Sequence, residues 1–319
     1  MSASVVERPT RWVTRVPLLE RALLVALAGA ALMAPPAGSR LAAADAKAAT
    51  VRPAAKASRD HPFTNTLGMR FVPVPGVAVL FSVWETRVRD FRAFVDATGY
   101  DATGKMYAIG PEGWRIRDRT WMEPGFPQTA NHPVCGVSFV DATRFCEWLT
   151  ARERAAGSVG PNDRFRLPTD AEWSAAVGET RYPWGDDWPP PPMAGNYGDA
   201  ESDLSPKILT YRDGYSRTAP VGVFSANRHG IHDLGGNVWE WCDTFYRREM
   251  NSTETLQQFP GLEEDGGGTR YRVLRGGSWD RVTPAFLESA CRNNDEPDGR
   301  GDFLGFRVVF EPAGKTGGR

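Results

Sequence analysis

The sequence predicts a single mixed α+β domain with little regular secondary structure. First, the chain of 319 residues contains 33 glycines and 25 prolines, which favour turns over long helices or wide sheets. Second, only a few segments combine an N-terminal capping residue with helical apolar spacing, and the alternation typical of strands occurs in short runs. Third, 11 tryptophans and 16 phenylalanines supply the large apolar side chains that a core needs. We expect this domain to span residues 62–312.

The helices are predicted from their start signals. The first follows Thr86, which is a candidate N-cap, and Gly99 ends it. The second begins at Ser138, where Asp141 three residues later completes a capping box. The third is short and begins at Thr169 with a capping box of the same type.

Short strands are predicted where apolar and polar residues alternate between turn residues. Two lie before the first helix, at 69–74 and 79–84, and the others follow the third helix, at 238–241, 272–275 and 305–310. Beyond residue 180 turn signals dominate, so we expect the connection that leads to residue 238 to be loop.

The first 44 residues have the three parts of a cleavable signal peptide. Four arginines precede an apolar run over 22–34, and small residues around Ala44 provide a candidate cleavage site. The apolar run is shorter than the roughly 20 residues that a helix needs to span a bilayer, so no stable membrane span is expected after cleavage. The alternative is a disordered or loosely anchored tail. We therefore expect an exported protein, periplasmic or secreted, with a flexible linker over 45–61 and a disordered tail over 313–319.

Charge and cysteine content narrow the classes of function. With 38 basic and 39 acidic residues the formal net charge is -1, so no global field favours nucleic acid as a partner. Four cysteines suit an exported protein with one or two disulfides, and the sequence does not choose among the possible pairings. These are Cys135, Cys146, Cys242 and Cys291.

Several sequence blocks follow one another in a characteristic order. They are Trp84-Glu85-Thr86, His132-Pro133-Val134-Cys135-Gly136, Arg166-Leu167-Pro168-Thr169, Tyr182-Pro183-Trp184-Gly185, Thr218-Ala219-Pro220-Val221, Gly235-Gly236-Asn237-Val238-Trp239-Glu240-Trp241, Arg275-Gly276-Gly277-Ser278-Trp279 and Leu304-Gly305-Phe306-Arg307. In this order they resemble the sulfatase-modifying-factor family, the fold of the formylglycine-generating enzymes. The resemblance implies a mixed α+β domain of low regular content that is distantly C-type-lectin-like.

The resemblance also implies two calcium sites. One is matched by the side chains of Asn196 and Asp213 and by the backbone carbonyls of Tyr197 and Tyr215. The other is matched by residues around the Gly-Asn-Val-Trp-Glu-Trp turn, namely Asp233, Gly236, Val238 and Glu240. Ca²⁺ takes about six to eight oxygen ligands, which loops supply readily. The alternative is that Asp213 and Glu240 only cap turns or pair with arginines.

The family's copper-dependent oxidation implies a pair of redox cysteines that this chain lacks. The two redox positions fall at Asp280 or Arg281 and at Ala285 or Phe286. Cu(I) prefers soft thiolate ligands, which none of these four side chains provides. We therefore expect neither a copper site nor conversion of cysteine to formylglycine.

Two further cysteines match bridging positions of the family whose partners are replaced. The partner position of Cys146 is Val308, and that of Cys291 falls near Val177. Both thiols are then either free and buried, as small apolar groups, or paired in a different way.

A polar segment near the place where family substrates bind is a candidate ligand-binding site. An aromatic ring together with arginine is a common pairing in recognition. Asparagine and aspartate also tie irregular loops together without any ligand, which is the alternative. The candidate residues are Trp279, Arg292, Asn293, Asn294 and Asp295.

Three hypotheses for function follow. The first is an exported, calcium-stabilised binding or accessory module for a protein or a carbohydrate. The second is an enzyme that uses the same pocket without the cysteine pair. The third, a formylglycine-generating oxidase, is disfavoured because the thiolate pair that would bind copper is absent.

Overall fold

A computed structural model of the chain describes residues 54–252 and 270–314. The predicted signal peptide over 1–44 lies outside the described residues. Within the predicted linker, the described part contains a 3-10 helix, η1 (Ala54–Lys56), and both Ala54 and Ala57 pack against the core. No helix in the described ranges has the length and apolar character needed to cross a bilayer.

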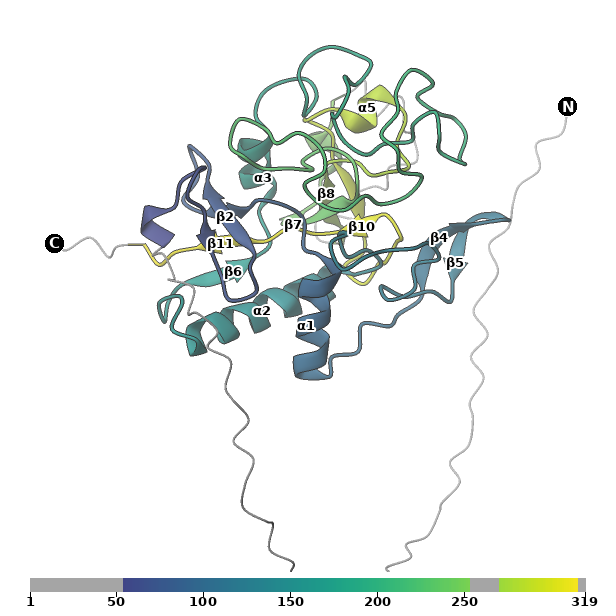
Figure 1. Cartoon of the computed structure of the whole chain (residues 1–319). Helices are drawn as coiled ribbons and strands as arrows, with labels where there is room; N and C mark the ends of the chain where they lie inside the picture. The colour runs from purple at the N-terminus through teal and green to yellow at the C-terminus, as the bar shows by residue number, and fades with distance from the viewer. Residues whose placement is uncertain (1–53, 253–269, 315–319) are drawn as a thin grey trace, which may run out of the picture. The chain divides into compact units, whose positions relative to one another are not determined.

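Two sheets carry the domain (Figure 1), and the larger one joins the two ends of the folded chain. Its five strands run antiparallel in the order β1-β2-β3-β11-β6, so β11 lies between β3 and β6. Val309 of β11 faces Phe81 on one side and Arg166 on the other. The strands are β1 (Phe63–Thr64), β2 (Arg70–Pro73), β3 (Leu80–Ser82), β6 (Arg164–Arg166) and β11 (Val309–Glu311).

The second sheet has the order β10-β7-β8-β9, and β10 runs parallel to β7. A separate two-stranded hairpin is formed by β4 and β5. The bounds are β4 (Met106–Gly110), β5 (Gly113–Arg117), β7 (Trp239–Phe245), β8 (Arg272–Arg275), β9 (Asn293–Asp295) and β10 (Leu304–Gly305).

The helices are α1 (Val88–Thr98), α2 (Phe139–Ala155), α3 (Asp170–Val177) and the short α5 (Pro284–Leu287), with a 3-10 turn η2 (Arg248–Met250). The aromatic rings of Phe91 in α1 and Phe145 in α2 stack at 6.1 Å, and both rings contact Phe306. This aromatic cluster therefore joins the two longer helices to the C-terminal part of the chain.

The predicted caps of α2 and α3 are confirmed. Ser138 Oγ accepts from the Asp141 amide, and Asp141 accepts from the Ser138 amide. Thr169 and Glu172 form the same reciprocal pair.

The predicted cap of α1 at Thr86 is wrong by one residue. The N-cap is Arg87, whose amide donates to Asp90. Thr86 stands before the helix: its amide donates to the Phe306 carbonyl, its carbonyl accepts from the Val134 amide, and its buried hydroxyl has no hydrogen-bond partner among the described residues.

Four strand predictions are confirmed: 69–74 is β2, 79–84 is β3, 238–241 is the start of β7 and 272–275 is β8. The predicted strand over 305–310 is two strands, β10 and β11, and the intervening Arg307 turns its side chain into the core. Strands β1, β4, β5, β6 and β9 were not predicted. As expected, the connection between α3 and β7 is loop.

We expect Ser138→Ala to lower the free energy of unfolding by about 1 kcal/mol, because the buried Asp141 amide at the start of α2 loses its acceptor. Urea unfolding measures the change. Ser138→Thr keeps the hydroxyl and is the matched control. A loss from Ser138→Ala no larger than that of the control would contradict the capping role.

Candidate functional site

A buried cluster of charge lies at the turn that leads into β7. Arg307 Nη2 and Nε each lie 2.6 Å from a carboxylate oxygen of Glu240, and neither side chain is more than 1% exposed. Trp173 Nε1 donates to the same Glu240 carboxylate at 2.8 Å. Arg307 also donates to the carbonyls of His232 and Asp233 at 3.0 Å. Glu240 therefore pairs with an arginine, which was the alternative to its role as a calcium ligand.

Glu85 is a second buried carboxylate of this cluster, and the sequence analysis missed it. Its oxygens accept from the Asn237 side-chain amide at 2.7 Å and from the Val238 amide at 3.2 Å. Burial, followed by the nearby Asp233 and Glu240 charges, raises the pKa of Glu85 well above its ordinary value. The signal in the sequence was an acidic residue shortly after the buried strand β3, within the Trp84-Glu85-Thr86 block.

The four residues of the first predicted calcium site are brought together. The Asp213 carboxylate accepts from the amides of Tyr197 and Tyr215, both at 2.9 Å. Burial raises the pKa of Asp213 to about 7. The Asn196 side chain donates to the Arg217 carbonyl at 2.7 Å, whereas its Oδ1 is buried and has no hydrogen-bond donor within the described ranges.

Asn237 links the two predicted sites. Its Oδ1 accepts from Asn196 at 3.1 Å and its Nδ2 donates to Glu85, so one side chain joins both groups of ligands. Its backbone has φ = 62°, a left-handed conformation that asparagine tolerates better than most residues. The sequence analysis placed Asn237 in a motif but assigned it no role.

The donor set suits a hard cation. Asp233 Oδ2 accepts from the Gly222 amide at 2.7 Å, but its Oδ1 is buried without a donor in the part of the chain that the structure describes. Burial raises the pKa of Asp233 as well. Each buried oxygen left without a partner costs about 1–3 kcal/mol, which a bound cation would remove. No three His, Cys, Asp or Glu side chains among the described residues are placed to hold an ion by themselves. A calcium ion here would therefore need amide and backbone oxygens too, as Ca²⁺ sites often use.

The predicted redox positions hold a cation stacked on an aromatic ring. The guanidinium of Arg281 lies 5.0 Å from the centre of the Phe286 ring and 3.2 Å from an Asp280 carboxylate oxygen. Asp280 also accepts from the Ser278 hydroxyl. Ala285 and Phe286 both belong to α5. The structure thus brings the two positions together, but with no soft ligand at either.

All four cysteines are free and buried, so the alternative of a rearranged disulfide is not realised. Burial raises the pKa of each thiol above its ordinary value, which keeps the nucleophilic thiolate scarce. These cysteines are Cys135, Cys146, Cys242 and Cys291.

Trp279 is a core residue and is only 1% exposed. Its ring stacks on Trp114 at 6.0 Å, and the guanidinium of Arg217 covers it at 4.7 Å. Arg217 lines a pocket of about 430 Å³ together with Arg119 and residues at the end of β4. The neighbouring Asp302 accepts from the Ile109 amide at 3.1 Å. Burial, with a smaller contribution from Asp280, raises the pKa of Asp302 to about 7.

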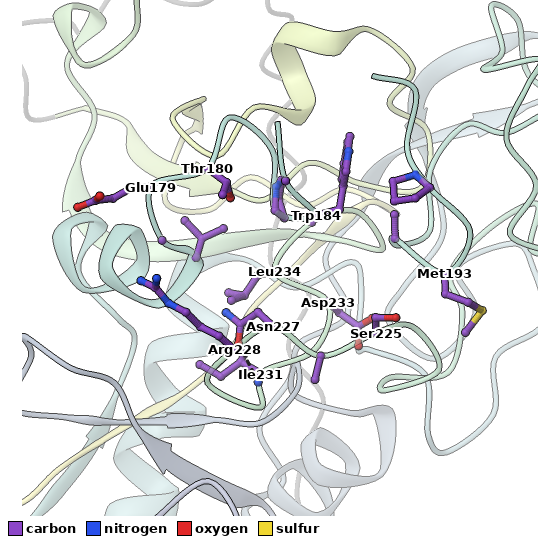
Figure 2. A pocket seen from close by; sticks show the side chains of 18 of the residues that line it. Glu179, Thr180, Trp184, Met193, Ser225, Asn227, Arg228, Ile231, Asp233 and Leu234 are labelled. Carbon is purple, nitrogen blue, oxygen red and sulfur yellow. Dashed lines mark hydrogen bonds between the residues drawn. The ribbon is translucent and has the colours of Figure 1, made fainter. Parts of the chain in front are cut away.

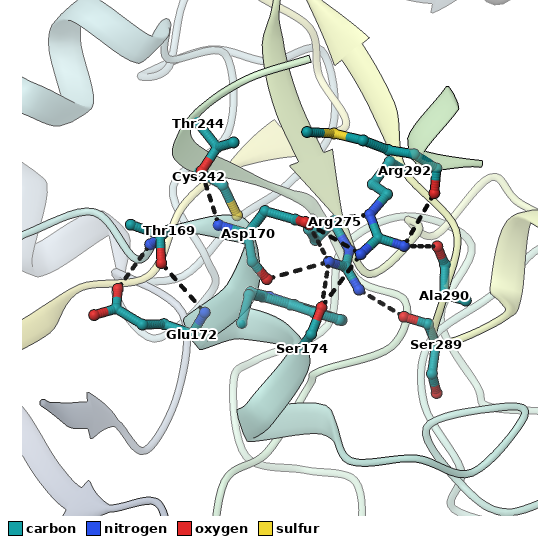
Figure 3. Close-up of polar contacts among 12 residues, drawn as sticks. Thr169, Asp170, Glu172, Ser174, Cys242, Thr244, Arg275, Ser289, Ala290 and Arg292 are labelled. Carbon is teal, nitrogen blue, oxygen red and sulfur yellow. Dashed lines mark hydrogen bonds and ion pairs between the residues drawn. The ribbon is translucent and has the colours of Figure 1, made fainter. Parts of the chain in front are cut away.

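The remaining candidate ligand-binding residues belong to a structural network (Figure 3). Arg292 and the buried Arg275 both donate to the Asp170 carboxylate at the start of α3, and Arg275 donates to the Ser289 carbonyl at 2.6 Å. Both the amide and the carbonyl of Arg292 are bonded to the Asn251 side chain.

The segment from Asn293 to Asp295, expected to be loop, is the strand β9. Asn294 faces Val273 and Asp295 faces Arg272 across the β8–β9 pair. Asn293, Asn294 and Asp295 were predicted to bind a ligand together with Trp279. In the structure these three residues extend a sheet, while Trp279 packs in the core.

Sequence comparison identifies relatives with named activities. The sequence family described as "Sulfatase-modifying factor enzyme 1-like domain" matches residues 81–312. The formylglycine-generating enzyme of Thermomonospora curvata is 31% identical over 266 residues, which is 70% of this chain and 79% of that enzyme. The hercynine oxygenase of Mycolicibacterium smegmatis is 29% identical over 249 residues, which is 70% of this chain and 50% of that protein.

Solved structures with the same fold are more distant in sequence. PvdO from Pseudomonas aeruginosa superposes with a TM-score of 0.53 at 24% identity, covering 73% of this chain and 80% of PvdO. Treponema denticola variable protein 1 superposes with a TM-score of 0.51 at 18% identity, covering 79% and 98%. These two similarities confirm the predicted α+β fold and carry no conclusion about activity.

The raised pKa of Asp302 predicts a pH dependence of stability. Between the ordinary value of about 3.9 and about 7, the unfolded chain has lost this proton while the folded chain keeps it. Its contribution to stability is therefore fully present below about pH 4 and is lost as pH rises towards 7, by at most about 1.4 kcal/mol per pH unit. Asp302→Asn should gain stability relative to the unmodified protein as pH rises from 4.5 to 8.

Urea unfolding across that pH range measures the difference between the two proteins. Asp203→Asn is the control, because a hydrogen bond from Arg217 holds the pKa of Asp203 below its ordinary value, outside the window. The control should shift stability equally at every pH. Parallel curves for Asp302→Asn would contradict the raised pKa.

Proposed function

Because the chain belongs to the sulfatase-modifying factor enzyme 1-like family, we propose that it is an exported member without cysteine-to-formylglycine oxidase activity, which acts as a calcium-stabilised binding or accessory module. The observation that carries this proposal is the Arg281–Phe286 pair at the redox positions. The export signal over 1–44 supports the exported location.

The Arg281–Phe286 pair opposes copper on two physical grounds. A guanidinium stays protonated at any physiological pH, so its fixed positive charge repels a monovalent cation. Neither side chain offers sulfur, which Cu(I) prefers as a ligand. The four cysteines that remain are buried elsewhere with raised pKa values, and none occupies position 281 or 286.

Calcium is supported by the surplus of buried oxygen. Glu85, Asp233 and Glu240 bring three carboxylates into one buried cluster in which Arg307 is the buried guanidinium. The Oδ1 atoms of Asn196 and Asp233 are the side-chain atoms that would hold a cation, with Asp213 at the first site. When bound, calcium would supply cross-links between loops and no redox chemistry. These loops contain few backbone hydrogen bonds of regular secondary structure, so such cross-links are a plausible source of rigidity.

A second candidate function is an enzyme that does not need the cysteine pair. The specific observation in its favour is Asp302, a buried carboxyl whose pKa of about 7 suits proton transfer near neutral pH. It lies beneath the pocket that Arg119 and Arg217 line, because the Ile109 amide that it accepts from belongs to that pocket's wall. Within the family, relatives named hercynine oxygenase show that the domain occurs in proteins named for another oxidation.

Purified protein should leave a Cys-x-Pro-x-Arg peptide unchanged in the presence of Cu(I) and oxygen. Mass spectrometry follows the conversion of the peptide thiol to an aldehyde, with the Thermomonospora curvata enzyme as positive control. The double variant Arg281→Cys/Phe286→Cys should bind Cu(I) at least tenfold more tightly than the single variant Arg281→Cys, since only the former supplies two thiolates. Conversion of the peptide by the unmodified protein would overturn the proposal.

Calcium should stabilise the EDTA-treated protein by about 2.7 kcal/mol when it is supplied at a hundred times its Kd. Thermal unfolding with and without Ca²⁺ measures the gain. Asn196→Ala and Asp233→Asn should each reduce it, whereas Glu147→Gln, which removes an exposed carboxylate on α2, should not. The calcium proposal fails if the gain is absent and elemental analysis finds no calcium in the protein as purified.

A further inference from the structure

A pocket of about 420 Å³ lies between two stretches of the long loop region that connects α3 to β7. Figure 2 shows the labelled side chains arranged around it. Its apolar lining includes the aromatic ring of Trp184 together with Pro183, Pro191, Pro192 and Met193. Its polar lining consists of Glu179, Thr180, Ser225, Asn227 and Arg228 together with Asp233.

Trp184 is held in one orientation before any ligand arrives. Its ring stacks parallel to Tyr182 at 4.7 Å and meets the edge of Tyr197 at 5.3 Å. Its Nε1 donates to the Asp187 carbonyl at 2.9 Å. Because these contacts fix the ring, a ligand that packs on it loses little affinity to ordering of the protein.

An exposed ring extends the aromatic surface beyond the pocket. The Trp188 ring lies 6.3 Å from that of Trp184, and 39% of the residue is accessible to solvent. Met193, which lines the pocket, is 48% exposed. A ligand longer than the pocket can therefore continue from Trp184 onto Trp188.

The polar side of the pocket offers both donors and acceptors. Arg228 uses Nε to bond His229, and no carboxylate among the described residues pairs with its terminal amino groups. Glu179, of opposite charge, lies in the same lining and forms no ion pair in the described part of the chain. Thr180 donates its hydroxyl to the Tyr182 carbonyl, which leaves its oxygen free to accept.

Asn227 has a structural role instead. Its Oδ1 accepts from the amides of His229 and Ile231, and its Nδ2 donates to the Ala176 carbonyl at the end of α3. It therefore fixes the loop that presents Arg228. Asp233 also lines the pocket, but its Oδ1 is buried and is a ligand of the proposed calcium site.

We propose that this pocket binds a neutral carbohydrate. A pyranose ring has an apolar C–H face, which packs on an indole ring through dispersion and burial of apolar surface. Its hydroxyls both donate and accept, which matches an arginine beside a glutamate and a threonine. Arg228 and Glu179 offset each other in charge, and Asp233 adds a carboxyl group to the lining, so a strongly anionic ligand is disfavoured. The volume lies in the range of roughly 300–1,000 Å³ that small-ligand sites occupy.

The inference rests on the proposed binding role and goes beyond it by naming a ligand class and a place. That place is separate from the pocket that Arg119 and Arg217 line and from the predicted redox positions. If no carbohydrate binds, the results of the copper and calcium experiments are unchanged. Failure of the carbohydrate proposal can therefore be distinguished from failure of the proposed function.

The test is titration calorimetry of the purified full-length protein with cellohexaose, maltohexaose, mannohexaose and chitohexaose. At least one of these should bind, and tryptophan fluorescence should change in parallel. Trp184→Ala should weaken the binding at least tenfold, and Trp188→Ala should weaken binding of the hexasaccharide more than of the matching disaccharide. Arg228→Gln and Glu179→Gln, which change surface groups and not packing, should each weaken it several-fold.

Phe245→Ala removes an exposed aromatic ring on β7 that does not line this pocket, and it should leave binding unchanged. Thermal unfolding shows whether each variant is folded, and the two glutamine variants keep the test valid if Trp184→Ala is not. Absence of binding by all four sugars would overturn the proposal. The proposal would also be overturned if Arg228→Gln and Glu179→Gln bound the sugar as tightly as the unmodified protein does. A third contradicting outcome is binding of a lysine-rich peptide that is lost in Trp184→Ala and that no sugar displaces.

Discussion

The buried ion pair between Arg307 and Glu240 is the interaction on which most of the site depends. It joins the segment between β10 and β11 to β7, and Trp173 brings α3 to the same carboxylate. Arg307 further donates to the carbonyls of His232 and Asp233, which orients the loop that carries Asp233 of the second predicted calcium site. Loss of one partner from such a buried pair costs about 3–5 kcal/mol, because the other charge stays buried and uncompensated. Because the Arg307 guanidinium pairs with Glu240, the neighbouring carboxylates of Glu85 and Asp233 have no arginine partner of their own among the described residues.

The parts of the fold that the sequence predicts are those encoded by local chemistry. Ser138 and Thr169 indicate the starts of their helices because a capping box is a contact between residues that are three apart in the sequence. Thr86 misled the prediction because its backbone bonds to Phe306, a partner more than two hundred residues away that no local pattern reveals. For the same reason the 305–310 segment reads as one strand, whereas the burial of Arg307 against Glu240 divides it. Asn293 to Asp295 looks like a loop because it lacks apolar residues, and only pairing with β8 makes it a strand.

The residues of the candidate site also fall into those that local motifs reveal and those whose role depends on contacts between distant parts of the sequence. Asn196, Tyr197, Asp213 and Tyr215 could be named from motifs, and the structure brings them together through the Asp213 carboxylate. Glu85 and Asn237 could not, because their importance lies in contacts across roughly 150 residues of sequence, Asn237 to Glu85 at 2.7 Å. Arg292 was chosen for its chemistry, but its guanidinium is committed to Asp170, which a sequence cannot show. A polar side chain is available to a ligand only when the fold leaves it without a partner.

The same principle applies to the predicted redox positions. The Arg281 guanidinium lies over the Phe286 ring and one of its terminal amino groups pairs with Asp280, so these contacts are made within the closing segment. The free polar and aromatic groups lie instead at the loops between α3 and β7, where Trp184 is fixed by Tyr182 and Tyr197 yet still lines a cavity. Loops of this kind tolerate change because the two sheets and the Arg307–Glu240 pair carry the fold, and it is there that a new specificity can arise.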